Sequence, residues 1–405
     1  MPIPTVRPGG DDALPRSAWL DVDLDAIRSN LGVIRAMAGP QTPIFPVVKA
    51  NAYGHGAIEV ARALAAAGAD GFCVATIDEA LVLRAARIRE PILVLYPVPP
   101  SWIPEAAHRR ISITAGDPVL LAETLHVLEA NPPRRPLGIQ LEVETGLGRG
   151  GFVEPDLVAA ARSIAEESTA RVDGLWTHLQ APEDEDITRR QIEAFEAAAS
   201  ELRTAGVRLP RRHVHASGSL LSDGVATDGG VRPGLSIYGL VPDELAGRKL
   251  DAGAARLRPA MSLRARPVRV TDLPAGWGIS YGPTYRTTGP TRIATLPLGY
   301  GDGWSRALSN RAEALVRGHR VPLVGNVAMD AVMADVTKVP GPPVTVTDEF
   351  TLFGSQGADV ISVAAVARAR GTNSWEVVTG MARRLPRVYH AASGPVVVRT
   401  LLSGG

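Results

Sequence analysis

Residues 45–56 read Phe45-Pro46-Val47-Val48-Lys49-Ala50-Asn51-Ala52-Tyr53-Gly54-His55-Gly56. The apolar residues before Lys49 predict a buried strand, and the small, polar and glycine residues after it predict a loop. Partial desolvation at such a strand end favours the neutral amine, which is a nucleophile toward a carbonyl. Lysine is also rare here, with only three among the 43 basic residues of the chain. A lone lysine at such a place more often extends from the strand end into solvent, so Lys49 by itself does not predict a nucleophile.

Short apolar runs alternate with helical patterns around this segment, from about residue 43 to residue 240. The eight runs are Ile44–Val48, Gly71–Ala75, Ile92–Tyr96, Ile111–Thr114, Gly138–Val143, Val172–His178, Arg212–Ala216 and Val231–Tyr238. Helical patterns between them include Asp78–Arg89, which Thr76 and Glu79 begin as a capping box, and Asp156–Ser168. Eight strand–helix units predict an α/β fold, a (β/α)8 TIM barrel, with a doubly wound open sheet as the alternative.

The pattern changes after about Leu257. Strand-like pieces separated by glycine- and proline-rich turns predict a mostly β C-terminal domain; they are Met261–Val270, Arg292–Leu298, Val344–Phe353 and Pro395–Leu401. Leu245–Ala255 is expected to be a linker. The predicted organisation is a disordered tail over 1–16, a barrel over 25–255 and a β domain over 256–405. The N-terminal strand 17–24 is expected to be part of the β domain.

Composition excludes several classes of protein. The chain has 405 residues, a net charge of +1 and 45% hydrophobic residues, which indicates neither nucleic-acid binding nor disorder. No apolar run approaches the ~20 residues of a membrane span, and the N-terminus lacks the apolar segment of a signal peptide. The single cysteine, Cys73, excludes an internal disulfide and a multi-cysteine metal site. A cytoplasmic protein without membrane or nucleic-acid partners is expected.

A glycine loop, Gly146-Leu147-Gly148-Arg149-Gly150-Gly151, has the G-x-G-x-x-G spacing of dinucleotide-binding folds. Two features argue against that interpretation. Pro155 and Asp156 delay the next helix, so no helix N-terminus meets the third glycine, and the nearest candidate acid for the ribose, Asp173, begins its strand rather than ending it. The loop therefore does not predict a nucleotide site.

Chemistry in a barrel belongs at the carboxyl ends of its strands. The candidates at these ends are Lys49, Arg149, His178, Ser219 and Gly234. Barrels also often bind phosphate at the loops after strands seven and eight, where this chain has a hydroxyl, glycine amides and an arginine. The spacing His213-x-His215 puts two imidazoles on one face of a strand, but without a third ligand nearby it is weak evidence for a metal.

Together these segments resemble the alanine racemases, which use pyridoxal 5'-phosphate. The resemblance covers residues 17–390 and rests on Val47–Gly56, Thr145–Arg149, Trp176–Leu179, His215–Ser219, Val231–Leu235, Gly278–Gly282, Pro297–Gly303, Val327–Asp330 and Arg384–Arg387. It implies that Lys49 holds the cofactor covalently and that its phosphate is bound by the hydroxyls of Tyr53 and Ser219 and the amides of Gly234 and Leu235. Arg149 is implied to reach both the cofactor and the substrate carboxylate.

The resemblance also implies the roles of more distant residues. Arg232 would face the pyridine nitrogen, which a guanidinium cannot protonate, and His178 would bridge Arg232 and Tyr281. The segments of Tyr281, Met329 and Asp330 would enter the partner subunit's active site, so a homodimer with shared sites is expected. Related barrel decarboxylases carry a carboxylate where this chain has Arg232, so the arginine favours racemisation.

Two positions depart from the family. Many alanine racemases have a carbamylated lysine seven residues before the loop arginine, where this chain has Glu142; a glutamate can steady Arg149 without modification. The family usually has a tyrosine at Trp375, where it bonds the phosphate and narrows the entry. An indole has one N–H, no hydroxyl and a larger ring system, so Trp375 leaves open which size of amino acid can enter the site.

The resemblance therefore predicts a pyridoxal-phosphate-dependent amino-acid racemase of the two-base kind that interconverts L-alanine and D-alanine. Lys49 would work from one face of the substrate and Tyr281 of the partner subunit from the other. Three alternatives stay open: a racemase for serine or another amino acid in a biosynthetic pathway, a non-catalytic protein that binds pyridoxal phosphate, and a barrel decarboxylase. No metal is expected.

Overall fold

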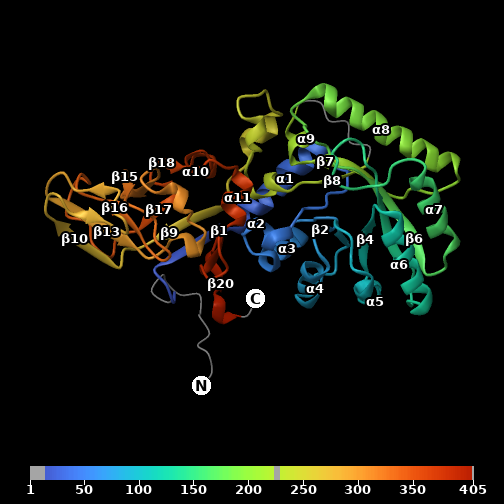
Figure 1. The fold of residues 1–405 in the computed structure, drawn as a ribbon, viewed down its shortest axis with the longest axis horizontal. Coiled ribbons are helices and arrows are strands. Elements are labelled where there is room, and N and C mark those ends of the chain that lie inside the picture. The colour runs from blue at the N-terminus through green and yellow to red at the C-terminus, as the bar shows by residue number, and fades with distance from the viewer. Residues whose placement is uncertain (1–13, 223–228, 404–405) are drawn as a thin grey trace, which may run out of the picture. The chain divides into compact units, whose positions relative to one another are not determined.

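The computed structural model describes residues 14–222 and 229–403. Contacts divide the chain into two compact units. One, the barrel unit, comprises Ile27–Ala52 and Ala57–Arg258; the other, the β unit, comprises the residues up to Ala26, Tyr53–Gly56 and the chain from Pro259 onward. The two are described separately (Figure 1).

The barrel unit contains a parallel sheet whose seven strands are neighbours in chain order, β2 to β8. They are β2 (Phe72–Val74), β3 (Ile92–Val94), β4 (Ile111–Ala115), β5 (Leu137–Glu142), β6 (Ala170–Trp176), β7 (Arg212–Ala216) and β8 (Gly230–Arg232). Single bridges from Ile44 to Val231 and from Val47 to Cys73 join a further segment to both end strands. This nearly closed barrel confirms the predicted fold class.

The prediction of a first strand over Ile44–Val48 was wrong in detail. The segment makes isolated bridges, and Pro46 has no N–H to donate. Its other amides still bond both neighbouring strands: the N–H groups of Phe45, Val47 and Val48 donate to the carbonyls of Val231, Pro233 and Cys73 at 2.8, 2.9 and 2.8 Å. The strand predicted over Val231–Tyr238 is also too long, because it ends at Arg232 and Leu235–Tyr238 forms a 3-10 turn.

Helices of the barrel unit lie outside its strands in Figure 1. They are α1 (Leu24–Ala38, which begins in the β unit), α3 (Ala57–Ala66), α4 (Ile77–Ala85), α5 (Ile103–His108), α6 (Pro118–Ala130), α7 (Asp156–Glu166), α8 (Glu185–Thr204) and α9 (Ser217–Leu221). The predicted capping box of Thr76 and Glu79 is present at α4. The expected linker Leu245–Ala255 is packed instead, because Leu245 and Ala254 are buried against Leu221.

The β unit is built on one sheet with the strand order β10-β13-β16-β15-β14-β17-β9-β1-β19-β20 and β18 beside β17. Its strands are β1 (Ala18–Asp23), β9 (Met261–Ala265), β10 (Arg269–Leu273), β13 (Thr291–Leu296), β14 (Glu313–Val316), β15 (His319–Val324), β16 (Val332–Asp335), β17 (Phe350–Gln356), β18 (Asp359–Ile361), β19 (Arg387–Ala391) and β20 (Gly394–Arg399). A separate pair, β11 (Gly278–Ile279) and β12 (Tyr285–Arg286), and two helices, α10 (Val363–Arg370) and α11 (Ser374–Thr379), complete it.

The predicted N-terminal strand is confirmed, since β1 pairs with β9 and β19. The strand predicted over Val344–Phe353 was wrong in its first half, because β17 begins at Phe350. Of the predicted tail, residues 1–13 lie outside the described part, whereas Arg16 is held by an ion pair with Asp302.

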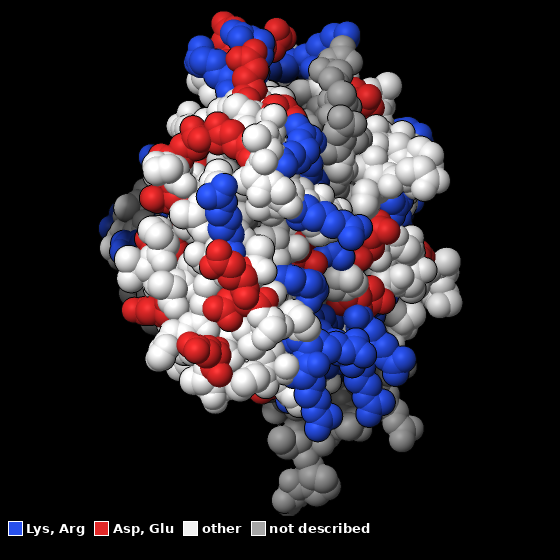
Figure 2. Space-filling view, turned by 90° about the vertical axis from the view of Figure 1, so that its right-hand side faces the viewer, with Lys and Arg blue, Asp and Glu red and all other residues white. Residues whose placement is uncertain are grey.

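Surface charge agrees with the balanced composition. Acidic and basic side chains are interspersed over most of the face shown in Figure 2, and basic ones gather at one edge. Within the described residues, none of the helices has the length and apolar character that crossing a membrane requires.

Candidate active site

Lys49 begins a left-handed turn at the carboxyl end of the first barrel segment. It is the first residue of α2 (Lys49–Tyr53), in which Ala50, Asn51 and Ala52 have φ of 51°, 56° and 55° and Tyr53 has φ of 51°. A left-handed residue other than glycine costs roughly 1–2 kcal/mol, so four in succession need support from their surroundings.

Hydrogen bonds supply that support. The Ala50 N–H donates to the Glu79 carboxylate at 2.6 Å, and the Asn51 side chain accepts from the Ala57 N–H at 2.9 Å. The Ala52 N–H donates to the Val48 carbonyl at 2.9 Å. The sequence predicted a loop here, and the structure shows a turn that fixes the direction in which Lys49 leaves the backbone.

The Lys49 amine lies in a cationic environment. Burial lowers the pKa of Lys49, Arg149 and Arg232 lower it further, and Glu79 and Cys73 oppose the shift. Lys49 is half-buried, and both predicted arginines act on its amine electrostatically. A lowered pKa increases the fraction of neutral amine at neutral pH.

Arg232 is buried at the end of β8, and its guanidinium has several acceptors. It donates to the carbonyls of His213 at 2.8 Å, Thr177 at 2.6 Å and Val214 at 3.4 Å, and to the His213 ring. Its Cζ lies 4.8 Å from the centre of the Trp176 ring. Burial lowers the pKa of Arg232 to about 10, so it stays charged at neutral pH.

His213 is a site residue that the sequence did not predict. Burial first, and then Arg232, lowers its pKa well below the usual value, so the ring is neutral. Because Arg232 can only donate, Nδ1 of His213 must accept, and Nε2–H donates to Gln140 Oε1 at 2.5 Å. The ring also stacks on Trp176 with an angle of 4° between planes. The available signal was His213-x-His215, whose same-face spacing was considered only as a metal pair.

His178 lies at the end of β6, near the same cations. Burial first, and then Arg232, Arg149 and Lys49, lowers its pKa to about 3. The imidazole is therefore neutral throughout the physiological range. Among the described residues, the Arg232 guanidinium donates to His213, Thr177 and Val214 rather than to the His178 ring, so the predicted bridge from His178 to Arg232 is not formed by a direct hydrogen bond here.

Arg149 and Glu142 are paired, as the sequence predicted. Arg149 Nη2 lies 3.6 Å from Glu142 Oε1, and the carboxylate is 10% exposed against 38% for the arginine side chain. The Arg149 guanidinium also lies 5.7 Å from the centre of the Tyr96 ring.

The glycine loop binds a carboxylate of its own chain. The Glu144 side chain accepts from the N–H groups of Gly146, of Gly148 at 2.9 Å and of Arg149 at 3.2 Å. The amides that would hold a nucleotide phosphate are thus engaged, which agrees with rejecting the dinucleotide interpretation.

The predicted phosphate region contains a hydroxyl that the sequence interpretation missed. Ser217 Oγ accepts from the N–H groups of Gly234 at 2.9 Å and Ser236 at 3.1 Å, which joins the start of α9 to the segment after β8. The predicted Ser219 is buried and accepts from the Ala216 N–H at 3.2 Å. Leu235 is buried beside Gly234. The structure therefore brings Ser219, Gly234 and Leu235 to the ends of β7 and β8.

The remaining predicted residues belong to the β unit. Tyr53 is buried, whereas Tyr281 is 79% exposed between β11 and β12, and Met329 is 52% exposed. Asp330 is exposed, and Trp375 is half-buried in the first turn of α11, which Asn373 caps. No group of three or more candidate metal ligands occurs among the residues that the structure describes.

Comparisons with known proteins agree with this geometry. The sequence matches the families described as "Alanine racemase, N-terminal domain" over residues 22–242 and "Alanine racemase, C-terminal domain" over residues 260–389. It is 38% identical over 379 residues to "Alanine racemase 2" of Caldanaerobacter subterraneus subsp. tengcongensis, which covers 92% of this chain and 95% of that protein.

Solved structures match the chain as well. The alanine racemase of Bacillus anthracis with bound L-Ala-P matches with a TM-score of 0.88 and 34% identity, over 96% of this chain and 99% of that one. A histidine racemase from Leuconostoc mesenteroides subsp. sake matches with a TM-score of 0.84 and 29% identity, over 93% and 99%. Because the similar curated proteins and solved structures are racemases, the chain is an isomerase of the racemase class. The chain belongs to the alanine racemase family.

Proposed function

We propose that this protein interconverts L-alanine and D-alanine with pyridoxal 5'-phosphate as cofactor, in the cytoplasm and as a homodimer. The observation that carries the proposal is the Lys49 amine at a barrel strand end, whose pKa burial and two arginines lower, in a chain of the alanine racemase family. The family relatives support alanine as substrate.

The residues present fit this cofactor chemically. An aldehyde needs a neutral amine, which Lys49 supplies, and a phosphate monoester needs hydroxyl and amide donors, which the segments of Ser219, Gly234 and Leu235 would provide at the ends of β7 and β8. The Gly234 N–H, which donates to Ser217 Oγ in this structure, would have to turn from that hydroxyl to the phosphate. Tyr53 would add a phenol, and Trp375 an indole N–H. When bound, pyridoxal phosphate withdraws electrons from the substrate and so acidifies its Cα–H.

Arg232 would set how strongly that withdrawal acts. A guanidinium with a pKa of about 10 keeps its proton at neutral pH, so Arg232 would donate a hydrogen bond without transferring its proton. Its contacts with the His213 ring, the Thr177 carbonyl and the Trp176 face hold it in one orientation. This arrangement favours racemisation over the decarboxylation considered from the sequence.

Two bases would move the proton. Lys49 Nζ would remove or return it on one face of the substrate, and the partner subunit's Tyr281 on the other. The 79% exposure of Tyr281 supports a role toward a second chain, because a phenol used within its own unit would be shielded there. His178, neutral with a pKa of about 3, could accept or donate one hydrogen bond to that phenol but could not supply a charge.

Arg149 would bind the carboxylate of the amino acid. Its guanidinium lies 3.6 Å from Glu142 Oε1 and 5.7 Å from the centre of the Tyr96 ring, and its backbone N–H donates to Glu144. Met329 and Asp330 would complete the substrate site from the partner subunit.

A second candidate is a racemase for a larger amino acid. Trp375 departs from the family pattern at the position that narrows the entry, and a histidine racemase shares this fold over 93% of the chain. A non-catalytic protein that binds the cofactor is disfavoured by the match to the racemase C-terminal domain over residues 260–389.

A substrate panel distinguishes these candidates. The purified protein, supplied with pyridoxal phosphate, should racemise L- and D-alanine with the highest kcat/KM, and L-serine and L-histidine more slowly, as measured by chiral chromatography. Faster turnover of serine or histidine would favour the second candidate. Absence of racemisation with every amino acid would refute the proposed function.

A further inference from the structure

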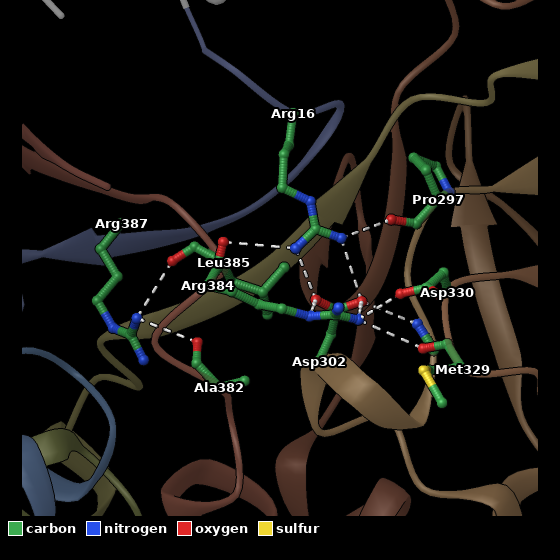
Figure 3. Close-up of polar contacts among 10 residues, drawn as sticks. Arg16, Pro297, Asp302, Met329, Asp330, Ala382, Arg384, Leu385 and Arg387 are labelled. Carbon is green, nitrogen blue, oxygen red and sulfur yellow. Dashed lines mark hydrogen bonds and ion pairs between the residues drawn. The ribbon is translucent and has the colours of Figure 1, made fainter. Parts of the chain in front are cut away.

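A buried carboxylate of the β unit, Asp302, holds two arginines. Asp302 is fully buried, and it accepts from Arg16 at 2.7 and 3.2 Å, from Arg384 at 2.7 and 3.1 Å and from the Gly299 N–H at 3.1 Å. Burial alone would raise the pKa of this carboxyl, but the hydrogen bonds from Arg16, Arg384 and Gly299 outweigh burial and lower it. Asp302 therefore stays ionised and fixes both guanidinium groups (Figure 3).

Arg384 continues from the buried carboxylate to an exposed one. While its Nε and Nη2 face Asp302, Nη2 also donates to Asp330 Oδ1 at 2.7 Å and lies 3.4 Å from the Met329 carbonyl. The Asp330 side chain is 65% exposed, against 0% for Asp302. The two-point contact with Asp302 fixes the plane of the guanidinium, so the direction in which it meets Asp330 is also fixed.

The backbone on either side is held just as closely. The N–H groups of Tyr300 and Gly301 donate to the carbonyls of Ala328 and Met329, each at 3.0 Å. A Cβ on Gly299 would lie 2.0 Å from the Ala328 carbonyl oxygen. The Gly299–Gly303 segment therefore packs backbone to backbone against the chain that carries Met329 and Asp330.

A Cβ on Gly301 would lie 2.4 Å from Arg384 Nη2. The glycine thus leaves room for the guanidinium beside the Met329 carbonyl. Because Gly301 has no side chain, the Arg384 guanidinium can contact the buried carboxylate of Asp302 and the exposed carboxylate of Asp330 at the same time.

We infer that Arg384 is a positioning residue, which orients the Asp330 carboxylate and the Met329 backbone for the amino-acid substrate. The inference rests on the proposed function, in which these two residues face the substrate. An ion pair as exposed as Arg384–Asp330 contributes little to stability, so its fixed geometry points to orientation rather than to folding. Asp302 acts one step further back, by fixing Arg384.

Arg16 offers a matched control. It binds the same buried carboxylate with similar distances, and otherwise contacts the carbonyls of Pro297 and Arg384. Arg16→Gln and Arg384→Gln therefore remove the same kind of partner from Asp302, but only the second removes the contact with Asp330. A purely structural role predicts equal effects of the two substitutions.

The test uses the full-length holoenzyme and two measurements. Arg384→Gln should raise KM for alanine about tenfold with kcat nearly unchanged, as expected for loss of one charge-assisted hydrogen bond, and Arg384→Lys should recover part of the loss. Hydrogen exchange of the peptide around residues 326–333 should become faster in Arg384→Gln. Arg16→Gln should change neither quantity, while both glutamine variants should lower the unfolding temperature to a similar degree.

Equal KM and equal exchange in the two glutamine variants would overturn the inference. The inference would also be overturned if Arg384→Gln left the KM for alanine unchanged while the unmutated protein racemises normally. Failure of the proposed function would look different, because the unmutated protein would then show no racemisation.

Discussion

Replacing Glu142 by glutamine tests the feature in which this chain departs from its family. Glu142→Gln keeps the shape of the side chain and removes the charge that faces Arg149 at 3.6 Å. If Arg149 binds the substrate carboxylate, the loss should appear mainly as a higher KM for alanine, with kcat and the cofactor absorbance little changed. The variant should also need no bicarbonate, since nothing at this position can be carbamylated.

The magnitude follows from the distance and the exposure. Two unit charges 3.6 Å apart attract by about 1 kcal/mol in water and by about 4–5 kcal/mol at the effective dielectric of a protein surface. The Arg149 side chain is 38% exposed and the contact lies just beyond hydrogen-bond distance, which places the pair in the lower part of that range. A loss of about 1–2 kcal/mol corresponds to a rise in KM of roughly 5- to 30-fold.

The pH dependence gives a second readout. Burial raises the pKa of Glu142, although Arg149 and Arg232 partly oppose the shift. As the pH falls through this raised value, the carboxylate is protonated and its hold on Arg149 weakens, so KM should rise on the acid side at a higher pH than an ordinary glutamate would cause. Glu142→Gln should abolish this acid limb, because its amide does not titrate.

Steady-state kinetics of the purified holoenzyme from pH 5 to 9 would measure both effects, with the exposed Glu129→Gln on α6 as control. A Glu142→Gln enzyme with unaltered KM and an unaltered acid limb would show that this carboxylate does not steady Arg149.

Three further substitutions address the catalytic roles. Lys49→Ala should abolish the absorbance of lysine-bound cofactor and essentially all racemisation, because it removes the anchor and one base; an unchanged spectrum would refute the central proposal. Tyr281→Phe should leave that absorbance intact and impair the proton transfer on one face of the substrate, which solvent-deuterium exchange from each enantiomer would measure; equal small losses in both directions would indicate a structural tyrosine. Mixing inactive Lys49→Ala and Tyr281→Ala subunits should restore part of the activity if the sites are shared between subunits, and exchange without recovery would place each site within one chain.

The barrel could be predicted because its signals are local. Apolar runs such as Ile92–Tyr96 and Arg212–Ala216, and the capping box at Thr76, need only neighbouring residues to be recognised, and the structure has strands and a helix at these places. The first strand is irregular for an equally local reason, since Pro46 has no N–H to donate, although Phe45, Val47 and Val48 still donate to neighbouring carbonyls. The left-handed turn after Lys49 could not be predicted, because alanine and asparagine carry no strong signal for it and the support from Glu79 comes from elsewhere in the barrel.

The site was predicted through motifs, and the motifs omit the groups that hold the catalytic side chains. Arg232 was found, but its partner His213 was not, because the pairing of β7 with β8 contains a register shift between His213 and Ala216 that no sequence spacing reveals. The alternation of side chains along a strand puts His213 and His215 on one face. Whether His213 binds a metal or accepts a hydrogen bond from an arginine depends on which residue lies opposite it. That information comes only from the neighbouring strand.

Ion pairs between residues far apart in the sequence are also missed, because they too depend on what the fold brings together. Arg16, expected to belong to a disordered tail, binds Asp302 from 286 positions away, and Arg384 binds the same carboxylate from 82 positions away. Arg16 is not distinguishable by its local sequence from the many other arginines of this chain, and the Arg384–Arg387 motif marks Arg384 without saying what the guanidinium binds. What selects them is a buried carboxylate that stays charged only if donors surround it, so the fold must bring cations to it wherever they lie in the sequence. A search that starts from buried carboxylates and asks which cations reach them therefore finds Arg16, which the sequence assigned to a tail, and it finds the partners of Arg384, which the motif alone does not give.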